Sequence, residues 1–284
     1  MRLFSLAEAS HFCQNYTQES GDSEYKISDF YATHLAHVSN VREHSSRFNE
    51  YRACLMRETE RNLFLSMAQY RRCLDLLHSS SSHWAFVTLY YASWYAAQAV
   101  LAMYGGRVFK NHVIDVGVGT PGNQRLDRRK IGNGPGEEPT LTRGSHRNFW
   151  KIYYNSVGSL VPTVPAHLTM AVSPVSANEF WQIEMRNEYN YETFSAIDLN
   201  KDFQAGFSVS SFPVSLPGAL NTQYRVAESM IEHAYGVARQ LNIATDALVM
   251  YGNSGIRQKI RQHIYSPKPP ALVRRTRKVQ ILSA

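Results

Sequence analysis

Residues 84–104 read WAFVTLYYASWYAAQAVLAMY, and this stretch decides the fold class. It runs for 21 residues without a charged side chain, which is long enough to span a bilayer as a helix. Its tyrosines and tryptophans prefer membrane interfaces, however, and several of them would lie at mid-membrane. A helix that is apolar on every side is also typical of the centre of a helical bundle. We therefore expect a buried helix here, with a membrane-associated protein as the weaker alternative.

The segment before this stretch also predicts a helix. From Phe48 to Leu77, apolar residues recur at mostly three- and four-residue steps, as they do on one face of an amphipathic helix. The serine run at 79–82 ends this helix, and the central helix begins at His83. Gly105-Gly106 ends the central helix, because glycine readily adopts the positive φ that follows a helix C-terminus.

Later parts of the chain carry weaker helical patterns. Ser176 and Glu179 have the spacing of a capping box, which predicts a helix from Ala177 to Tyr191. The pattern of residues 149–157 fits either a short helix or a strand. Two more helices are expected at residues 221–241 and 256–264.

The class predicted by these patterns is mainly α, since strong strand alternation is missing from the chain. We divide the sequence into an N-terminal arm (residues 1–47), a helical region (48–243) and a basic C-terminal arm (244–284). Residues 113–176 form a loop-rich insertion in the helical region, because they contain most of the turn-forming glycines and prolines.

The net charge of +7 is unevenly distributed. No acidic residue follows Asp246, so residues 1–246 hold 22 basic and 23 acidic side chains. A basic arm of this kind suits a polyanion or an acidic partner, although it also fits a solubilising tail. The eight cations after Asp246, which we expect to bind nucleic acid, are Arg257, Lys259, Arg261, Lys268, Arg274, Arg275, Arg277 and Lys278.

Several classes of protein are excluded by composition and motif. The three cysteines are too scattered for a disulfide scaffold or a zinc site, and no histidine pair suggests metal binding. The glycine-rich run VGVGTPGN lacks the Gly-Lys-Ser/Thr ending of a phosphate loop. The first residues lack the apolar core of a signal peptide. We therefore expect a reduced, cytoplasmic protein with no metal and no cofactor.

Three further stretches belong together: YYASWYAAQAVL at 90–101, GRVFKNH at 106–112 and RNEYNY at 186–191. In this order and spacing they resemble the HEPN superfamily (higher eukaryotes and prokaryotes nucleotide-binding domain). The resemblance covers roughly residues 48–112 and 177–243. It implies a four- to five-helix bundle that dimerises and places polar residues of both copies in one cleft.

The family resemblance also implies a site. Many members are metal-independent ribonucleases with an Arg-x(4–6)-His motif, in which arginine binds the phosphate and histidine moves protons. Here Arg186 and Asn187 match the motif, but no histidine follows in range, and Tyr191 is the nearest polar ring. The expected site is therefore Arg186, Asn187 and Tyr191, with His112 as the only nearby base that matches the family.

Three other segments also fit Arg-x(4–6)-His: Arg107 with His112, Arg72 with His78 and Arg257 with His263. We interpret the second pair as surface residues and the third as part of the basic arm. The first pair is the better candidate, because it follows the central helix inside the resembling segment. The alternative for His112 is a histidine that anchors a loop through a backbone hydrogen bond.

The function implied by the resemblance is RNA binding, with metal-independent endoribonuclease activity in a prokaryotic toxin–antitoxin or antiviral defence system. Its expected partners are RNA, a second copy of the chain, and an antitoxin or other defence-complex subunit. The alternative is a catalytically inactive module that serves as a binding or assembly subunit of a larger complex. The missing histidine after Arg186 favours that alternative.

Overall fold

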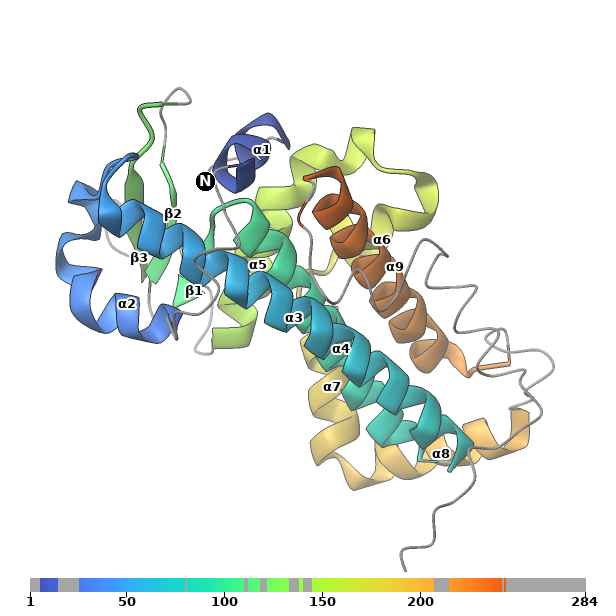
Figure 1. The fold of residues 1–284 in the computed structure, drawn as a ribbon. Helices are drawn as coiled ribbons and strands as arrows, with labels where there is room; N and C mark the ends of the chain where they lie inside the picture. The colour runs from blue at the N-terminus through green and yellow to red at the C-terminus, as the bar shows by residue number, and fades with distance from the viewer. Residues whose placement is uncertain are drawn as a thin grey trace, which may run out of the picture.

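The computed structural model describes residues 6–14, 26–79, 81–109, 112–117, 122–132, 138–139, 145–206, 215–241 and 243. These residues form a mainly α structure with one small sheet (Figure 1). The prediction of a mainly α class is therefore confirmed. The helix expected at 256–264 and the whole basic arm after residue 243 lie outside the described residues.

Two long antiparallel helices organise the molecule. Helix α3 (Ser46–His78) is 33 residues long, and α4 (Ser82–Met103) returns beside it (Figure 1). The hydroxyl of Ser45 caps α3 by accepting a hydrogen bond from the Phe48 amide at 3.2 Å. After α4 the chain turns through Gly105, whose φ of +75° is favourable only for glycine.

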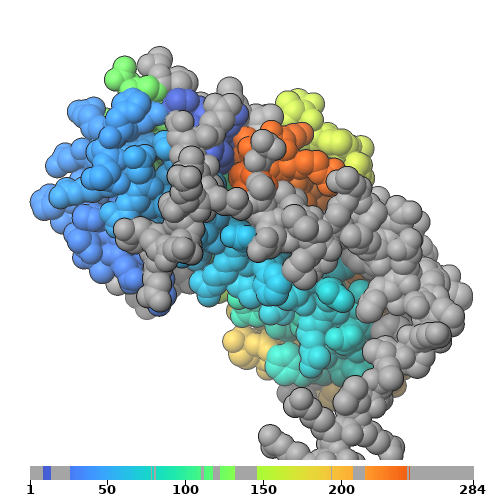
Figure 2. All heavy atoms as spheres, in the orientation of Figure 1, coloured from blue at the N-terminus to red at the C-terminus, as the bar shows by residue number. Residues whose placement is uncertain are grey.

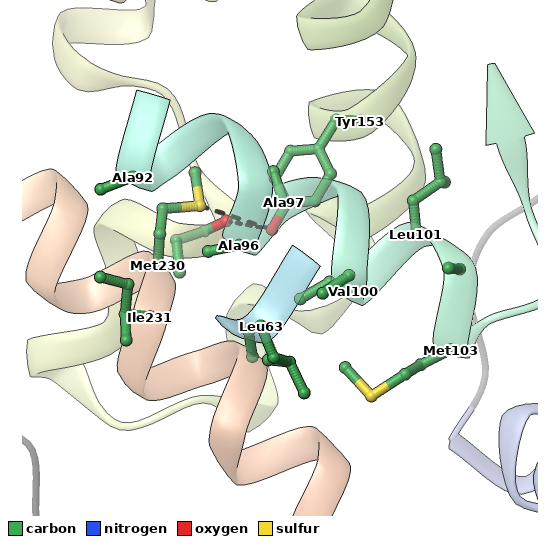
Figure 3. Packing of buried hydrophobic residues seen from close by; sticks show 14 of the residues in the cluster. Leu63, Ala92, Ala96, Ala97, Val100, Leu101, Met103, Tyr153, Met230 and Ile231 are labelled. Carbon is green, nitrogen blue, oxygen red and sulfur yellow. Dashed lines mark hydrogen bonds between the residues drawn. The ribbon is translucent and has the colours of Figure 1, made fainter. Parts of the chain in front are cut away.

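Helix α4 is the centre of the core, as its all-apolar sequence predicts. It packs against α3, against α9 (Gly218–Gln240) and against α7 (Trp181–Tyr191). Small residues on α4 allow large neighbours to approach it closely. Figure 3 shows Ala96 and Ala97 of α4 surrounded by Tyr153, Met230 and other buried side chains.

The remaining helices cover this core. Helix α5 (Ser145–Val157) resolves the open interpretation of residues 149–157 in favour of a helix. Helix α8 (Thr193–Gly206) follows α7 after a single residue and was not expected from the sequence. Short segments α6 (Thr169–Val172) and the 3₁₀ turns at Gly158–Thr163 and Ala166–Leu168 connect α5 to α7.

The predicted capping box at Ser176 and Glu179 is wrong. Ser176 lies in a 3₁₀ turn with φ of +52°, and α7 begins only at Trp181. The N-cap position of α7 is Phe180, and Asn178 forms a turn just before it, in which the side-chain oxygen of Asn178 accepts from the Phe180 amide at 2.9 Å. Asparagine makes this short turn readily, since its side chain mimics the backbone.

A small sheet occupies part of the expected loop-rich insertion. Strands β1 (Arg107–Phe109), β2 (His112–Val116) and β3 (Leu126–Gly132) pair antiparallel in that order, and the two-residue β4 (Glu138–Pro139) adds in parallel. The strands were not predicted from the sequence, because neither β2 nor β3 shows alternating apolar and polar residues. Strand β2 is buried on both faces, and β3 carries three successive cations.

The sheet is tied to the helices by a buried tyrosine. Tyr51 of α3 donates its hydroxyl toward the Gly105 and Ile114 carbonyls, at 3.1 and 3.2 Å. This contact joins the end of α4 to the middle of β2. Figure 1 shows the sheet at one end of the molecule, with α7 and α8 toward the other.

Part of the predicted N-terminal arm packs into the same core. Helices α1 (Leu6–Gln14) and α2 (Ile27–His34), with the 3₁₀ helix η2 (Leu35–Asn40), bury Phe12 and Phe30 against α3. In Figure 2 the blue atoms of this part adjoin those of the first turns of α3.

The three cysteines are free and buried in this core. Burial raises the pKa of the Cys13 and Cys54 thiols to about 12, and raises that of Cys73 further. No helix in the described ranges combines the length and apolar composition needed to cross a membrane.

Candidate functional site

The site is formed where α7 crosses α4. Gln182, Arg186 and Tyr189 follow one another at four- and three-residue steps, so they share one face of α7. Gln182 is buried, and Tyr189 packs on Phe86 of α4 with ring centroids 4.8 Å apart. Arg186 therefore lies on the face of α7 that is turned to α4.

Aromatic residues of α4 lie beneath the Arg186 guanidinium. Its central carbon lies 5.2 Å from the centroid of the Tyr90 ring, a cation–π contact. Nη1 donates to the hydroxyl of Tyr91 at 3.4 Å. Nε and Nη2 both donate to Oδ1 of Asn187, at 3.2 and 2.5 Å. Asn187 thus fixes the orientation of the guanidinium from the next position in the chain.

A histidine from a third helix completes this cluster. Nδ1 of His146, in the first turn of α5, lies 2.6 Å from Oη of Tyr90. Its ring stacks on Trp94 with centroids 4.1 Å apart. Nε2 faces away from the Tyr90 contact, and no hydrogen bond joins it to another of the described residues. We call Arg186, Asn187, His146, Tyr90 and Trp94 the α4–α7 site.

Electrostatics keep this histidine neutral. Burial, and then the positive charge of Arg186, lower the pKa of His146 to about 4. The Tyr90 hydroxyl also accepts a hydrogen bond from Trp150 Nε1 at 3.3 Å. Because a phenol both donates and accepts, the Tyr90 contact can hold the imidazole in either tautomer.

The guanidinium has no carboxylate partner in the part of the chain that the structure describes. The nearby acid of α7, Glu184, pairs instead with Arg147 at 3.6 Å and accepts from Asn178 at 3.0 Å. Arg186 and Asn187 are only half-buried. The α4–α7 site is therefore a partly exposed, cationic and aromatic surface that suits an anion with a planar base.

Sequence reasoning missed His146. Its signal was present, because His146, Phe149, Trp150, Tyr153 and Val157 follow a three- and four-residue spacing. That spacing predicts an amphipathic helix whose inner face is aromatic and begins with a histidine. A polar ring at the start of a buried aromatic face is a candidate site residue.

Of the two residues of α7 that were expected to act with Arg186, one contacts it and the other does not. Asn187 contacts it directly, as described above. Tyr191 ends α7 with 72% of its surface exposed, and five residues along a helix place it about 140° around the axis from Arg186. No contact among the described residues joins Tyr191 to Arg186.

His112 lies in the sheet. It begins β2 opposite Phe109 and Lys130. Burial, together with the charges of Arg128 and Lys130, lowers its pKa. Among the described residues, the neighbours of His112 belong to the sheet, whereas those of Arg186 belong to α4 and α5. No contact among them joins His112 to Arg186.

Of the other Arg-x(4–6)-His segments, the arginines that the structure describes make their contacts away from this site. Arg107 donates to Gln98 at 2.6 Å and pairs with Glu58 at 3.7 Å, so its charge is compensated. Arg72 is exposed beside Asp75, as expected for a surface residue. The side chain of His78, the pair Arg257 and His263, and all eight cations of the basic arm lie outside the described residues.

No group of three or more potential metal ligands occurs within the described ranges. The α4–α7 site itself offers a cation, an imidazole and stacked rings. No family model, curated protein or solved structure matches the chain.

Proposed function

We propose that the protein is a HEPN-like RNA-binding protein that cleaves RNA without a metal ion at the α4–α7 site. The observation that carries the proposal is the position of an imidazole and a guanidinium on one aromatic surface, where no carboxylate of the described residues pairs with the guanidinium. Arg186 and His146 have the residue types that the family motif places on one helix, but here they come from α7 and α5.

The chemistry follows from the substrate. In RNA the 2′-oxygen attacks the adjacent phosphorus, the bond from phosphorus to the 5′-oxygen breaks, and a 2′,3′-cyclic phosphate and a 5′-hydroxyl remain. Negative charge grows on the phosphate oxygens during this step. Arg186 would stabilise that charge, since its guanidinium can donate two parallel hydrogen bonds. Asn187 holds the guanidinium in place.

His146 would move the protons. Nε2 is the nitrogen that faces away from Tyr90, so it is the atom that can accept the proton of the 2′-hydroxyl or return one to the 5′-oxygen. A bound phosphate adds negative charge beside the imidazole and offsets the charge of Arg186. Both effects raise the pKa of His146 from about 4 toward the range useful for catalysis.

The same low pKa favours a second candidate function. An imidazole with a pKa of about 4 is a weak base at neutral pH. If RNA does not raise it, the α4–α7 site is a catalytically inactive module that binds RNA through charge and stacking. Such a module would act as a binding or assembly subunit of a larger complex.

The biological setting proposed here is that of the HEPN resemblance: a cytoplasmic homodimer in a toxin–antitoxin or antiviral defence system. An apolar surface at the α7–α8 corner supports association of two copies. Tyr191, Phe194 and Ile197 expose 72%, 84% and 44% of their surface there. Large apolar side chains exposed together are typical of interaction surfaces.

The test is incubation of the purified protein with end-labelled RNA in EDTA. We expect 2′,3′-cyclic phosphate ends, lost in Arg186→Ala and in His146→Ala. His112→Ala is the matched comparison, because it removes the histidine that the sequence alone favours. Cleavage lost in His112→Ala but retained in His146→Ala would reverse the assignment. If the wild-type protein and all three variants bind RNA but none of them cleaves it, the catalytically inactive module is the function that remains.

A further inference from the structure

A pair of arginines faces each other at the sheet end of the molecule. Arg42, just before α3, and Arg125, just before β3, form an isolated antiparallel bridge. The Glu43 amide donates to the Gln124 carbonyl at 2.7 Å, and the Leu126 amide donates to the Val41 carbonyl at 2.9 Å. These bonds flank the bridge, so Arg42 and Arg125 are a non-hydrogen-bonded pair. That arrangement brings facing side chains closest, with Cβ atoms about 4.5–5.5 Å apart.

The charges of this arginine pair are not compensated within the described residues. Both side chains are exposed, and neither makes an ion pair or a side-chain hydrogen bond there. The adjacent acid, Glu43, is only 6% exposed. Its oxygens are bound by His11 at 2.5 Å and by the amides of Gly122 and Gln124 at 2.9 and 2.8 Å. Like charges placed directly opposite each other destabilise a strand pair, so this pair has a cost that a bound anion would remove.

Three more exposed cations lie on the segments that follow this pair in the chain. Arg47 is exposed in the first turn of α3, which contains no acidic residue. Arg128 and Lys130 are exposed on the face of β3 opposite to that of Arg125, because side chains alternate along a strand, and Arg128 donates to the Leu35 carbonyl at 2.7 Å. Of the acids of the two long strands, Asp115 pairs with Arg129, and Asp127 lies opposite Asp115 in the register, on the same strand face as Arg125. We call Arg42, Arg47, Arg125, Arg128 and Lys130 the basic end.

We infer that the basic end binds the phosphate backbone of the RNA whose cleavage is proposed for the α4–α7 site. Charge complementarity selects this occupant, because two exposed cations that face each other, with further exposed cations on the adjoining segments, match successive phosphates of a strand. The inference rests on the proposed function for the identity of the polyanion. Contacts to phosphates away from the reacting bond bind ground state and transition state equally, so they lower KM and leave kcat unchanged.

The sharpest variant is Arg42→Glu. It places a carboxylate directly opposite Arg125, so it exchanges a repulsive cross-strand pair for an attractive one. We therefore expect the melting temperature to stay the same or rise while RNA binding weakens. This combination separates loss of a binding surface from loss of folding.

The experiment measures fluorescence anisotropy of a labelled single-stranded RNA across a range of salt concentrations. Arg42→Glu with Arg125→Glu should weaken binding at least tenfold at low salt. It should also reduce the slope of log K against log salt by about 1.4, or about 0.7 for each lost phosphate contact. The control, Arg71→Glu with Arg72→Glu, makes the same change in charge near the other end of α3, about 36 Å along the helix from Arg47. We expect less than a threefold effect from it.

The outcomes separate this inference from the proposed function. Weaker binding by the basic-end variants, with kcat intact and KM raised, supports the inference. Equal weakening by both double variants would show that only net charge matters and would overturn it, while the α4–α7 site would stand. Unchanged binding by Arg42→Glu with Arg125→Glu, when Arg186→Ala abolishes cleavage, would overturn the inference alone. Failure of the wild-type protein to bind RNA would overturn both.

Discussion

The hydroxyl of Tyr90 lies 2.6 Å from Nδ1 of His146, although 56 residues separate them in the chain. This contact joins the centre of α4 to the first turn of α5. It orients an imidazole beside Arg186, which reaches the same tyrosine ring from α7. Three helices therefore bring a cation, a base and stacked rings to one surface.

The pKa of His146 should respond to anions. In the free protein it is lowered to about 4 by burial and then by the charge of Arg186. Saturating inorganic phosphate should raise it by about 1–3 units, because an adjacent anion favours the imidazolium. The measurement is an NMR pH titration of the histidine ring signals. In Arg186→Ala, the free-state pKa should be higher and the phosphate effect smaller; identical titrations with and without phosphate would contradict the assignment.

Tyr90→Phe should reduce both stability and cleavage. It removes the partner of His146 and Trp150, which leaves buried polar atoms unpaired at a cost of about 1–3 kcal/mol. Tyr70→Phe is the matched control, because Tyr70 is equally buried and its hydroxyl donates to that of Tyr224 at 2.5 Å. We expect both variants to lose stability in urea but only Tyr90→Phe to lose cleavage. Equal loss of cleavage would assign Tyr90 a purely structural role.

His233 should make folding sensitive to acid. It is 5% exposed on α9, and burial lowers its pKa to about 4. The unfolded chain, with an ordinary pKa of about 6.5, therefore binds a proton before the folded one does. The contribution of neutral His233 to the free energy of unfolding is complete above pH 6.5. It is lost as the pH drops toward 4, and the loss amounts to about 3 kcal/mol. Urea unfolding at several pH values should show a flatter profile for His233→Leu; parallel profiles would contradict this source of acid sensitivity.

Gly105→Ala should destabilise the turn after α4. The residue has φ of +75°, and a Cβ there would lie 2.7 Å from Cγ2 of Val116. The strained conformation and this contact together should cost about 2–3 kcal/mol. Gly158→Ala is the control, since a Cβ there meets no atom within 4 Å. Thermal unfolding should separate the two variants, and equal melting temperatures would show that the turn adapts.

Phe194→Glu should weaken self-association. Phe194 is 84% exposed at the start of α8, one turn from Ile197. A charge there opposes burial of this surface between two copies. Light scattering after size exclusion should show a shift toward monomer, whereas Phe64→Glu, at a 48% exposed position of α3, should leave the mass unchanged. A wild-type protein that is monomeric at all concentrations would remove the basis of this prediction.

The helical frame was largely predictable, because its signals are long and periodic. The spacing from Phe48 to Leu77 and the uncharged run at 84–104 predicted α3 and α4, and both helices lie within a few residues of the expected bounds. The sheet was not predictable in the same way. Its longest strand, β3, contains Arg128, Arg129 and Lys130 in succession, and this pattern is explained only by its neighbours in space.

The residues of the candidate site also fall into two groups: those that a local motif predicts and those that depend on contacts between helices. Arg186 and Asn187 were identified from a local motif, and they contact each other as neighbours on one helix. The spacing of residues 146–157 marks His146 as the first residue of an aromatic helix face, but its position beside Arg186 depends on the contacts of α5 with α4. His112 and Tyr191 are close to Arg186 by motif, but their described contacts do not reach it.

The burial of all three thiols has a practical consequence for labelling. The thiolate is the form that attacks thiol reagents, and a thiol with a pKa of about 12 forms almost no thiolate at neutral pH. The native chain is therefore a silent background for maleimide chemistry. A single exposed substitution away from the proposed dimer surface, such as Phe64→Cys, would accept one spin label per chain. Distances between labels on paired copies would then map how two protomers meet, with no need to remove a native cysteine.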